Sequence, residues 1–196
     1  MLNKLREIFE PVFLSIAKPF IKANLNPSAL TASSVLLAFL SFLLLSLSNR
    51  QPIIIISALI LFSLSSLFDA LDGAVARALN KVSNRGAFLD SFSDRVNEIL
   101  ILTGVLLSGI AEDIWCFLFL VTSLFISYCR ARGESLGINV SGVGVMERAE
   151  RALFIAVGLI LWLINENLLN YVLILGFLLN TITVFQRFIY LISKLD

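Results

Sequence analysis

Residues 69–94 read DALDGAVARALNKVSNRGAFLDSFSD, and this stretch separates two long apolar runs of the chain. Its four aspartates fall at positions 69, 72, 90 and 94. The first pair is three residues apart and the second pair is four apart, so the members of each pair share one face of a helix. We interpret the stretch as the end of one helix, a turn and the start of the next, with both pairs near the turn.

The rest of the chain has the composition of a membrane protein. Of its 196 residues, 58% are hydrophobic and 15% are charged, and the mean hydropathy is +0.93. Soluble domains carry about 25% charged residues, so too few polar side chains are present to cover a water-soluble enzyme. The net charge of +1 lacks the basic excess of a nucleic-acid-binding protein.

Reactive side chains of two common kinds are scarce. The chain has no histidine, so acid–base chemistry must use Asp, Glu, Lys, Tyr or Cys. Cys116 and Cys129 stand singly in apolar sequence, without the spacing of metal ligands or of a disulfide framework.

The apolar stretches on both sides of residues 69–94 predict an all-α integral membrane fold with six transmembrane helices. A spanning helix needs about 20 mostly apolar residues, and three stretches reach that length only when extended into adjoining charged segments. Pro27 and Pro52 fall at predicted helix starts, where the missing N–H costs little. We expect residues 23–196 to form one membrane domain. The predicted spans are 28–48, 52–79, 84–110, 113–135, 148–165 and 167–193.

Residues 1–22 alternate charged and apolar side chains, which is unlike a signal peptide. The pattern predicts an amphipathic helix lying on the membrane surface. An ordinary polar flank of the first span is the alternative.

The basic residues predict the orientation. If the N-terminus lies inside, Arg50 is the one residue among the 15 Lys and Arg that falls outside. Basic residues concentrate on the cytoplasmic side of membrane proteins. We therefore expect a multi-pass protein of the cell membrane with both termini and the four aspartates on the cytoplasmic side.

The four aspartates predict a metal site. Carboxylates close together near hydrocarbon repel one another, and ionisable groups at such a depth usually serve function. Two divalent cations would cancel the four charges, and oxygen ligands alone favour Mg²⁺, Mn²⁺ or Ca²⁺. The alternative is that these aspartates form ion pairs with Arg77, Arg85 and Arg95.

Paired divalent cations suit in-line displacement at phosphorus. The chain lacks a glycine–lysine phosphate loop, which argues against ordinary hydrolysis of a nucleoside triphosphate. The residues by themselves therefore predict a membrane phosphotransferase that acts at the cytoplasmic surface on a lipid-linked or diphosphate donor.

The same stretch resembles the signature of the CDP-alcohol phosphotransferase (phosphatidyltransferase) family at all eight defining positions. These are Asp69, Asp72, Gly73, Ala76, Arg77, Gly86, Asp90 and Asp94. Members have six transmembrane helices, are commonly homodimers, and displace CMP from a CDP-alcohol by a second alcohol. The resemblance implies two ions of Mg²⁺ or Mn²⁺ held by the four aspartates, with Asp94 also the general base.

The resemblance further implies a site for the CDP part of the donor. Residues 26–31 (NPSALT) look like the family's Asn-Pro-x-x-Leu-Thr segment, which opens the first span beside the nucleotide. By itself this segment would be only a helix start. The implied CDP-lipid-binding residues are Asn26, Pro27, Ser28, Ala29, Thr31, Gly73, Arg77 and Ser83.

Two further motifs resemble the inositol-phosphate branch of that family. Residues 127–134 (SYCRARGE) and 144–151 (GVMERAER) are similar to its S-Y-x-(K/R)-A-R-x-E and G-x-x-E-R-x-E-R patterns, with Gly133 in place of a more usual Ala. Members make phosphatidylinositol phosphate in some bacteria and archaetidylinositol phosphate in archaea. The implied acceptor is myo-inositol phosphate, and the implied donor is CDP-archaeol or CDP-diacylglycerol, with archaeol favoured by the resemblance.

A phosphorylated acceptor needs a cationic dock, and arginine binds phosphate with two parallel N–H groups. The expected acceptor phosphate ligands are Arg130, Arg132, Arg148, Arg151 and Arg187. The alternative is that these arginines flank the membrane and pair with Glu134, Glu147 and Glu150.

Three other functions stand against this one. A sister transferase using glycerol-3-phosphate would also need a phosphate dock. A cation transporter could line a pathway with carboxylates, but these acids gather at one membrane face. A purely structural membrane protein would explain neither the aspartate spacing nor the arginines.

Overall fold

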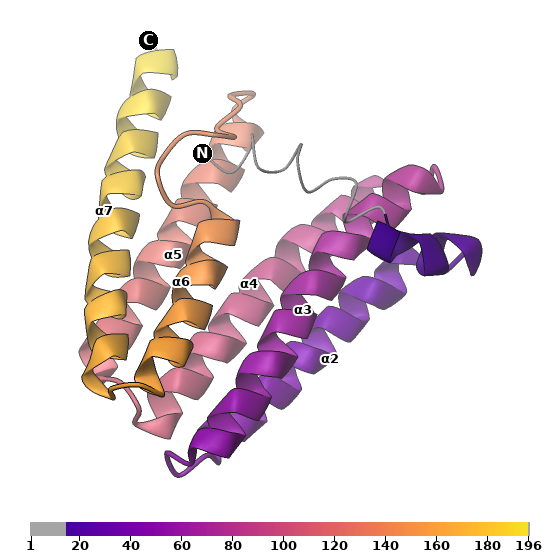
Figure 1. The fold of residues 1–196 in the computed structure, drawn as a ribbon. Coiled ribbons are helices and arrows are strands. Elements are labelled where there is room, and N and C mark those ends of the chain that lie inside the picture. Colours follow the sequence, from indigo (N-terminus) through magenta and orange to yellow (C-terminus); the bar gives the residue numbers. More distant parts are fainter. Residues whose placement is uncertain (1–14, 196) are drawn as a thin grey trace.

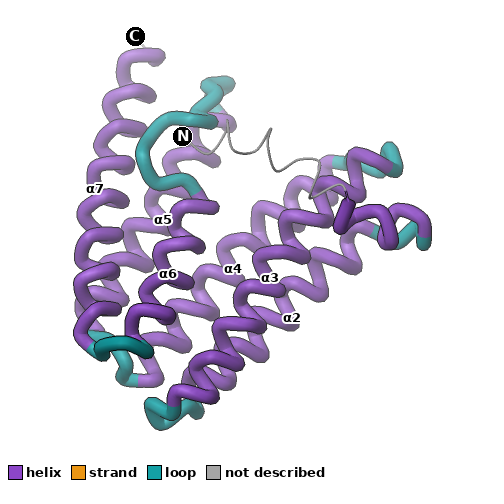
Figure 2. Tube along the Cα trace, viewed as in Figure 1, coloured by secondary structure: helices purple, strands orange, loops and turns teal. Residues whose placement is uncertain are grey.

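The structure is a computed structural model that describes residues 15–195, and this part of the chain is helical with no β-strand. Residues 15–22 are helical, and six longer helices follow (Figures 1 and 2). These are α2 (Pro27–Ser46), α3 (Pro52–Ala78), α4 (Asn84–Ser108), α5 (Asp113–Ser135), α6 (Arg148–Trp162) and α7 (Asn167–Leu195). Each boundary lies within three residues of its predicted place.

Four of these helices, α2, α3, α5 and α7, are long and apolar enough to cross a membrane. The chain is therefore a multi-pass membrane protein. Helix α6 has 15 residues, which is about 22 Å of helix against about 30 Å of hydrocarbon. The first half of α4 carries the charged residues of the predicted site.

The predicted surface helix over residues 1–22 falls mostly on residues 1–14, which lie outside the described part of the chain. Its last turns are helical, and Ala17 is fully buried in a small cluster with Leu30 of α2 and with Leu71 and Val75 of α3. This segment therefore packs against the start of α2 and the end of α3, the end that carries Asp69 and Asp72.

Local sequence signals set several helix ends. Asn26 caps α2 by accepting a hydrogen bond from the Ser28 N–H at 3.1 Å, and Pro27 fills the first helical position. Ser83 caps α4 in the same way, through the Gly86 N–H at 3.1 Å. Gly109 ends α4 at a φ of +64°, a conformation that glycine adopts without strain.

The helices form two groups of three. Helix α2 packs along α3 and α4, while α7 packs along α5 and α6, and the groups meet where α4 contacts α5 and α3 contacts α6. Figure 1 shows the two groups converging at the end that carries the α2–α3, α4–α5 and α6–α7 loops. They diverge towards the end where the α3–α4 and α5–α6 loops lie.

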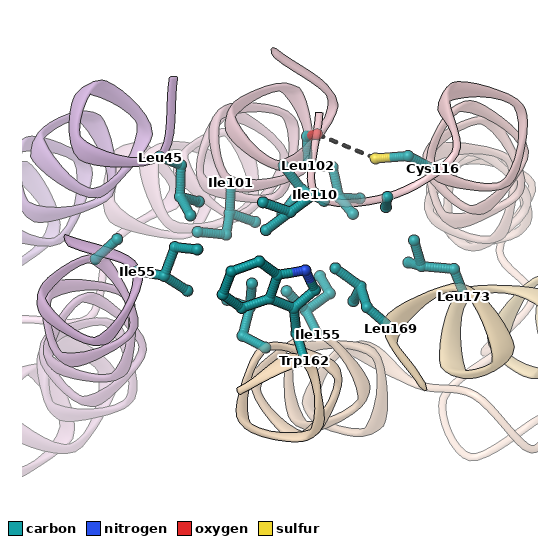
Figure 3. Close-up of a cluster of buried hydrophobic side chains, with 14 of the residues drawn as sticks. Leu45, Ile55, Ile101, Leu102, Ile110, Cys116, Ile155, Trp162, Leu169 and Leu173 are labelled. Carbon is teal, nitrogen blue, oxygen red and sulfur yellow. Dashed lines mark hydrogen bonds between the residues drawn. The ribbon is translucent and has the colours of Figure 1, made fainter. Parts of the chain in front are cut away.

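A buried apolar cluster fills the converging end (Figure 3). Trp162 of α6 lies among Ile101 of α4, Ile155 and Leu169. A Cβ added at Gly176 of α7 would lie 2.3 Å from the ring of Phe119, so glycine lets α7 approach α5 closely. Small residues commonly serve this purpose between helices in membranes.

Buried polar side chains tie the first group together nearer the aspartates. Ser65 of α3 donates to the Ser34 carbonyl of α2 at 2.8 Å, and Asn97 of α4 donates to the Ser34 hydroxyl at 3.3 Å. Ser41 donates to the Ala58 carbonyl at 2.7 Å. Hydrogen bonds of this kind fix the registers of α2, α3 and α4, and so fix the positions of the carboxylates that α3 and α4 carry.

Candidate active site

Three carboxylates converge where α3 ends and α4 begins. One oxygen from each of Asp69, Asp72 and Asp90 lies within 4.8 Å of the other two. Asp69 and Asp72 are 5% and 4% exposed, and Asp90 is half-buried. The turn between Ala78 and Asn84 is short, so the last turns of α3 lie beside the first turns of α4. The predicted grouping of these three residues is therefore seen in the structure.

Helix α2 supports this group from a third side. The Thr31 hydroxyl donates a hydrogen bond to Asp72 Oδ2 at 2.5 Å across 41 residues of sequence. The family resemblance predicts Thr31 beside the nucleotide, and in the structure its hydroxyl donates to a carboxylate. The part of α2 around Thr31, one turn after its start, therefore lies next to the carboxylate group.

Asp94 lies beside the group but outside the set of three. Its Oδ1 is 2.7 Å from Arg148 Nη1, and the same nitrogen contacts Asp69 Oδ2. Its Oδ2 is 3.5 Å from Arg95 Nη1. Arg148 comes from the first turn of α6, so one guanidinium joins both helix groups at the aspartates.

The residues present fit a divalent cation. Asp69 Oδ1 is buried and has no hydrogen-bond partner among the described residues, which leaves its lone pairs available to an ion. Buried carboxylates need a compensating charge, and Arg148 supplies only one for this group. Mg²⁺ and Mn²⁺ take oxygen ligands of this kind. The predicted alternative, ion pairs with arginine, holds for the Asp94–Arg95 contact.

The residues expected to hold the CDP part surround the same helix ends. Ser28 and Ala29 are exposed on the first turn of α2, and Ser83 is the exposed cap of α4. A Cβ at Gly73 would lie 3.3 Å from Arg77 Nη1, so this glycine gives the Arg77 guanidinium room to lie back along α3.

The five expected phosphate ligands fall into three places. Arg148 lies at the carboxylates, as described above. Arg151 is 3% exposed, and its Nε donates to Glu98 Oε1 at 2.7 Å. Arg187, also 3% exposed, donates to the Val143 and Ile126 carbonyls at 2.9 and 2.8 Å. Both buried side chains therefore also hold the α5–α6 region together.

Arg130 and Arg132 lie on the exposed last turns of α5. Arg130 pairs with Glu134 at 2.8 Å, as the alternative interpretation expected. Arg132 Nη1 is 3.4 Å from the Ser135 hydroxyl. Glu147, another of the predicted partners, instead accepts a hydrogen bond from the Gly142 N–H at 2.8 Å.

The sequence profile of the CDP-alcohol phosphatidyltransferase family matches residues 24–185. This chain belongs to the CDP-alcohol phosphatidyltransferase family. The match spans all of α2 to α6 and most of α7, and it includes every aspartate and arginine discussed above except Arg187. The protein is therefore a CDP-alcohol phosphotransferase, a membrane enzyme of phospholipid synthesis.

Named relatives of this phosphotransferase cover most of its length. The archaetidylinositol phosphate synthase of Pyrococcus horikoshii is 36% identical over 155 residues, which is 79% of this chain and 80% of that protein. The archaetidylinositol phosphate synthase of Aeropyrum pernix is 38% identical over 140 residues, 71% of this chain and 72% of that protein.

A solved structure has the same fold. The crystal structure of Mycobacterium tuberculosis phosphatidylinositol phosphate synthase with CDP-DAG bound matches with a TM-score of 0.78 at 25% identity, covering 92% of this chain and 94% of that one. The same mycobacterial protein in complex with manganese and citrate matches with a TM-score of 0.74 at 25% identity, over 91% and 88% of the two chains.

Two residues of this phosphotransferase were missed by the sequence interpretation. Thr183 of α7 accepts hydrogen bonds from the backbone N–H groups of Val145 and Met146, at 3.2 and 3.0 Å. Glu98 of α4 holds Arg151. The GVMER motif signalled the importance of residues 144–148, but nothing local indicates that a threonine far along the chain holds that segment in place.

Proposed function

We propose that this enzyme transfers a phosphatidyl-type group, with archaetidyl as the first candidate, from a CDP-lipid to myo-inositol phosphate and releases CMP. The convergence of Asp69, Asp72 and Asp90 beside Arg148 carries the proposal, because it brings carboxylates and a phosphate-binding side chain together. The synthase names of the archaeal relatives support the choice of substrates.

In this proposal Asp69, Asp72, Asp90 and Asp94 hold two divalent ions, Mg²⁺ or Mn²⁺. When bound, such ions would offset the charge of the diphosphate and polarise its phosphoryl oxygens. The manganese complex of the mycobacterial protein supports a metal of this class. Thr31 would keep Asp72 turned towards the ion, since its hydroxyl already holds one oxygen of that carboxylate.

The donor would lie with its tails in the bilayer, as CDP-archaeol or CDP-diacylglycerol, and its diphosphate at the aspartates. The structure of the mycobacterial protein with CDP-DAG supports a CDP-lipid as the ligand. We assign its nucleotide part to the exposed ends of α2, α3 and α4. The residues assigned are Asn26, Pro27, Ser28, Ala29, Thr31, Gly73, Arg77 and Ser83.

Asp94 would act as the general base. Its carboxylate takes the proton of the attacking inositol hydroxyl, and that oxygen forms a bond to the lipid-side phosphorus. The bond between this phosphorus and the CMP oxygen breaks, and CMP leaves with the electron pair. Arg148 keeps Asp94 oriented through the 2.7 Å contact to Oδ1. In this proposal, positioning of the reactants and compensation of charge provide most of the rate enhancement.

The acceptor phosphate would bind to Arg130, Arg132, Arg148, Arg151 and Arg187. Arg148 is the leading member, because it is 41% exposed and already touches two site carboxylates. The buried Arg151 and Arg187 would form the floor of the dock, and the exposed Arg130 and Arg132 its entrance.

The topology that we propose has six spans, with both ends of the chain and the site on the cytoplasmic side of the cell membrane. The starts of α2 and α4, the end of α3 and the start of α6 all contribute to one site, as helices of alternating direction would. We also propose that residues 1–22 form a surface helix attached to a membrane domain over 23–196, and that the enzyme is a homodimer.

An acceptor comparison tests the proposed function. Purified enzyme with CDP-archaeol and Mg²⁺ is supplied with myo-inositol phosphate or with glycerol-3-phosphate, and CMP release is measured. We expect release at least ten times faster with inositol phosphate. Faster release with glycerol-3-phosphate would assign the enzyme to the sister activity, and ion flux in liposomes without CMP release would reject both.

A further inference from the structure

Glu98 is a largely buried acid with no role in the proposed mechanism. It lies on α4 one helical turn beyond Asp94, so α4 directs Asp90, Asp94 and Glu98 along the same face. The side chain of Glu98 is 11% exposed, and it lies outside the eight-residue signature of the family. It lies four residues from Asp94, the proposed general base.

Glu98 binds Arg151 at two points. Its Oε1 accepts from Arg151 Nε at 2.7 Å and its Oε2 from Arg151 Nη2 at 3.3 Å. The same Nη2 lies 3.4 Å from the Ser127 hydroxyl of α5. Two-point pairing of a guanidinium and a carboxylate fixes orientation as well as distance. Arg151 therefore joins α4, α5 and α6 at one place.

This contact bears on Arg148 because both arginines lie in the first turn of α6. The N-cap of that helix, Glu147, makes no side-chain capping hydrogen bond, so contacts with other elements must hold the turn. Asp94, Glu98 and Arg148 also line one small cavity of about 30 Å³, together with Phe62, Ile101 and Ile155. The side chains of the neighbouring Arg151–Glu98 pair are only 4% and 11% exposed, so water screens that pair little.

We propose that Glu98 is a positioning residue of the acceptor dock. By clamping Arg151 it fixes the rotation of the first turn of α6, and so places the Arg148 guanidinium at the carboxylates where the acceptor phosphate binds. The inference rests on the proposed function only in assuming that the acceptor carries a phosphate. Glu98 itself touches no reacting group.

The test compares Glu98→Gln with wild type and with Glu166→Gln. Glutamine keeps the shape and an acceptor for Arg151 but removes the charge. Glu166 is a suitable control because its pair with Arg50 is exposed and 3.8 Å long. The measurements are kcat, the KM of the phosphorylated acceptor, the KM of the CDP-lipid and the affinity for Mn²⁺.

We expect Glu98→Gln to raise the acceptor KM at least ten-fold while the CDP-lipid KM and the Mn²⁺ affinity stay within two-fold. Glu98→Asp keeps the charge on a shorter side chain and should raise the acceptor KM about three-fold, so it serves if the glutamine variant does not fold. Glu166→Gln should change nothing beyond two-fold.

An unchanged or lower acceptor KM in Glu98→Gln or Glu98→Asp would overturn the proposal, since Glu98 would then only cancel the charge of Arg151. An equal loss in every parameter would assign it a merely structural role and overturn it too. If the wild type uses glycerol-3-phosphate, the proposed function fails, and the same test is run with that acceptor.

Discussion

The two carboxylate oxygens of Asp69 have different surroundings: one contacts an arginine and the other is free to bind a metal ion. Its Oδ2 contacts Arg148, while its buried Oδ1 has no hydrogen-bond partner among the described residues. Thr31 holds one oxygen of Asp72 in the same manner. Each carboxylate is thus oriented by one contact and retains capacity for another ligand. This arrangement is what a metal centre with preoriented ligands requires.

Asp94→Asn tests the general base at this scale. The amide cannot take the proton of the acceptor hydroxyl, and general-base catalysis contributes about 10²- to 10⁴-fold. We expect CMP release to fall at least about 100-fold while CDP-lipid binding stays detectable.

Asp113→Asn is the matched control, because Asp113 lies at the exposed start of α5 near the opposite end of the molecule. Full turnover in Asp94→Asn, or an equal loss in the control, would contradict the role of Asp94.

At the scale of elements, α7 sets where α6 begins. The Thr183 hydroxyl accepts the N–H groups of Val145 and Met146, and Arg187 donates to the Val143 carbonyl. Gly144 lies beside Thr183 with a φ of +111°, and a side chain larger than hydrogen would collide with Thr183 there. Helix α6 therefore starts at a fixed place, which brings Arg148 to the carboxylates.

Gly144→Ala tests that attachment. A Cβ there would lie 2.3 Å from the Thr183 methyl group and would stand on a left-handed backbone. We expect a loss of stability of about 1–3 kcal/mol together with a raised acceptor KM, measured by thermal unfolding and by kinetics.

Gly142→Ala separates the two effects, because Gly142 has a φ of +78° but nothing within 4 Å of its added Cβ. Gly142→Ala should lose less stability than Gly144→Ala, because it suffers backbone strain alone. Adding Thr183→Ser to Gly144→Ala removes the methyl group in the clash and should restore part of the stability. Equal losses of stability in Gly142→Ala and Gly144→Ala would show that the close approach of Gly144 to Thr183 is not what matters.

The helices and the carboxylates were largely predictable from sequence, because apolar length and the three- and four-residue spacing are local properties. The contacts of Arg151 and Arg187 were not. Their partners, Glu98 and the Val143 and Ile126 carbonyls, lie between 44 and 61 residues away. Only packing of the helices decides whether an arginine faces a ligand, a carboxylate or a backbone carbonyl.

At the scale of the whole molecule, packing and chemistry lie at opposite ends. The buried apolar cluster joins the two helix groups at one end, and the aspartates and Arg148 lie where the groups diverge (Figure 1). Such a division lets the apolar end hold the fold while the other end admits a lipid headgroup. It also predicts that the two ends face opposite sides of the membrane.

Labelling of single cysteines checks this orientation. In a background with Cys116 and Cys129 replaced by alanine, Gln51→Cys marks the α2–α3 loop and Ser141→Cys marks the α5–α6 loop, both exposed. We expect a membrane-impermeant maleimide to label position 51 in intact cells and position 141 only after permeabilisation. The reverse pattern, or labelling of both from one side, would contradict the proposed topology.

In the mechanism that we propose, aspartates of α3 and α4 together form one divalent metal centre. Titration of Mn²⁺ into purified enzyme, followed by electron paramagnetic resonance, tests it most directly. Asp72→Asn and Asp90→Asn, one from each helix, should each weaken Mn²⁺ binding at least ten-fold, while Asp113→Asn should bind as the wild type does. Wild-type Mn²⁺ affinity in both Asp72→Asn and Asp90→Asn would show that these two aspartates do not hold the metal.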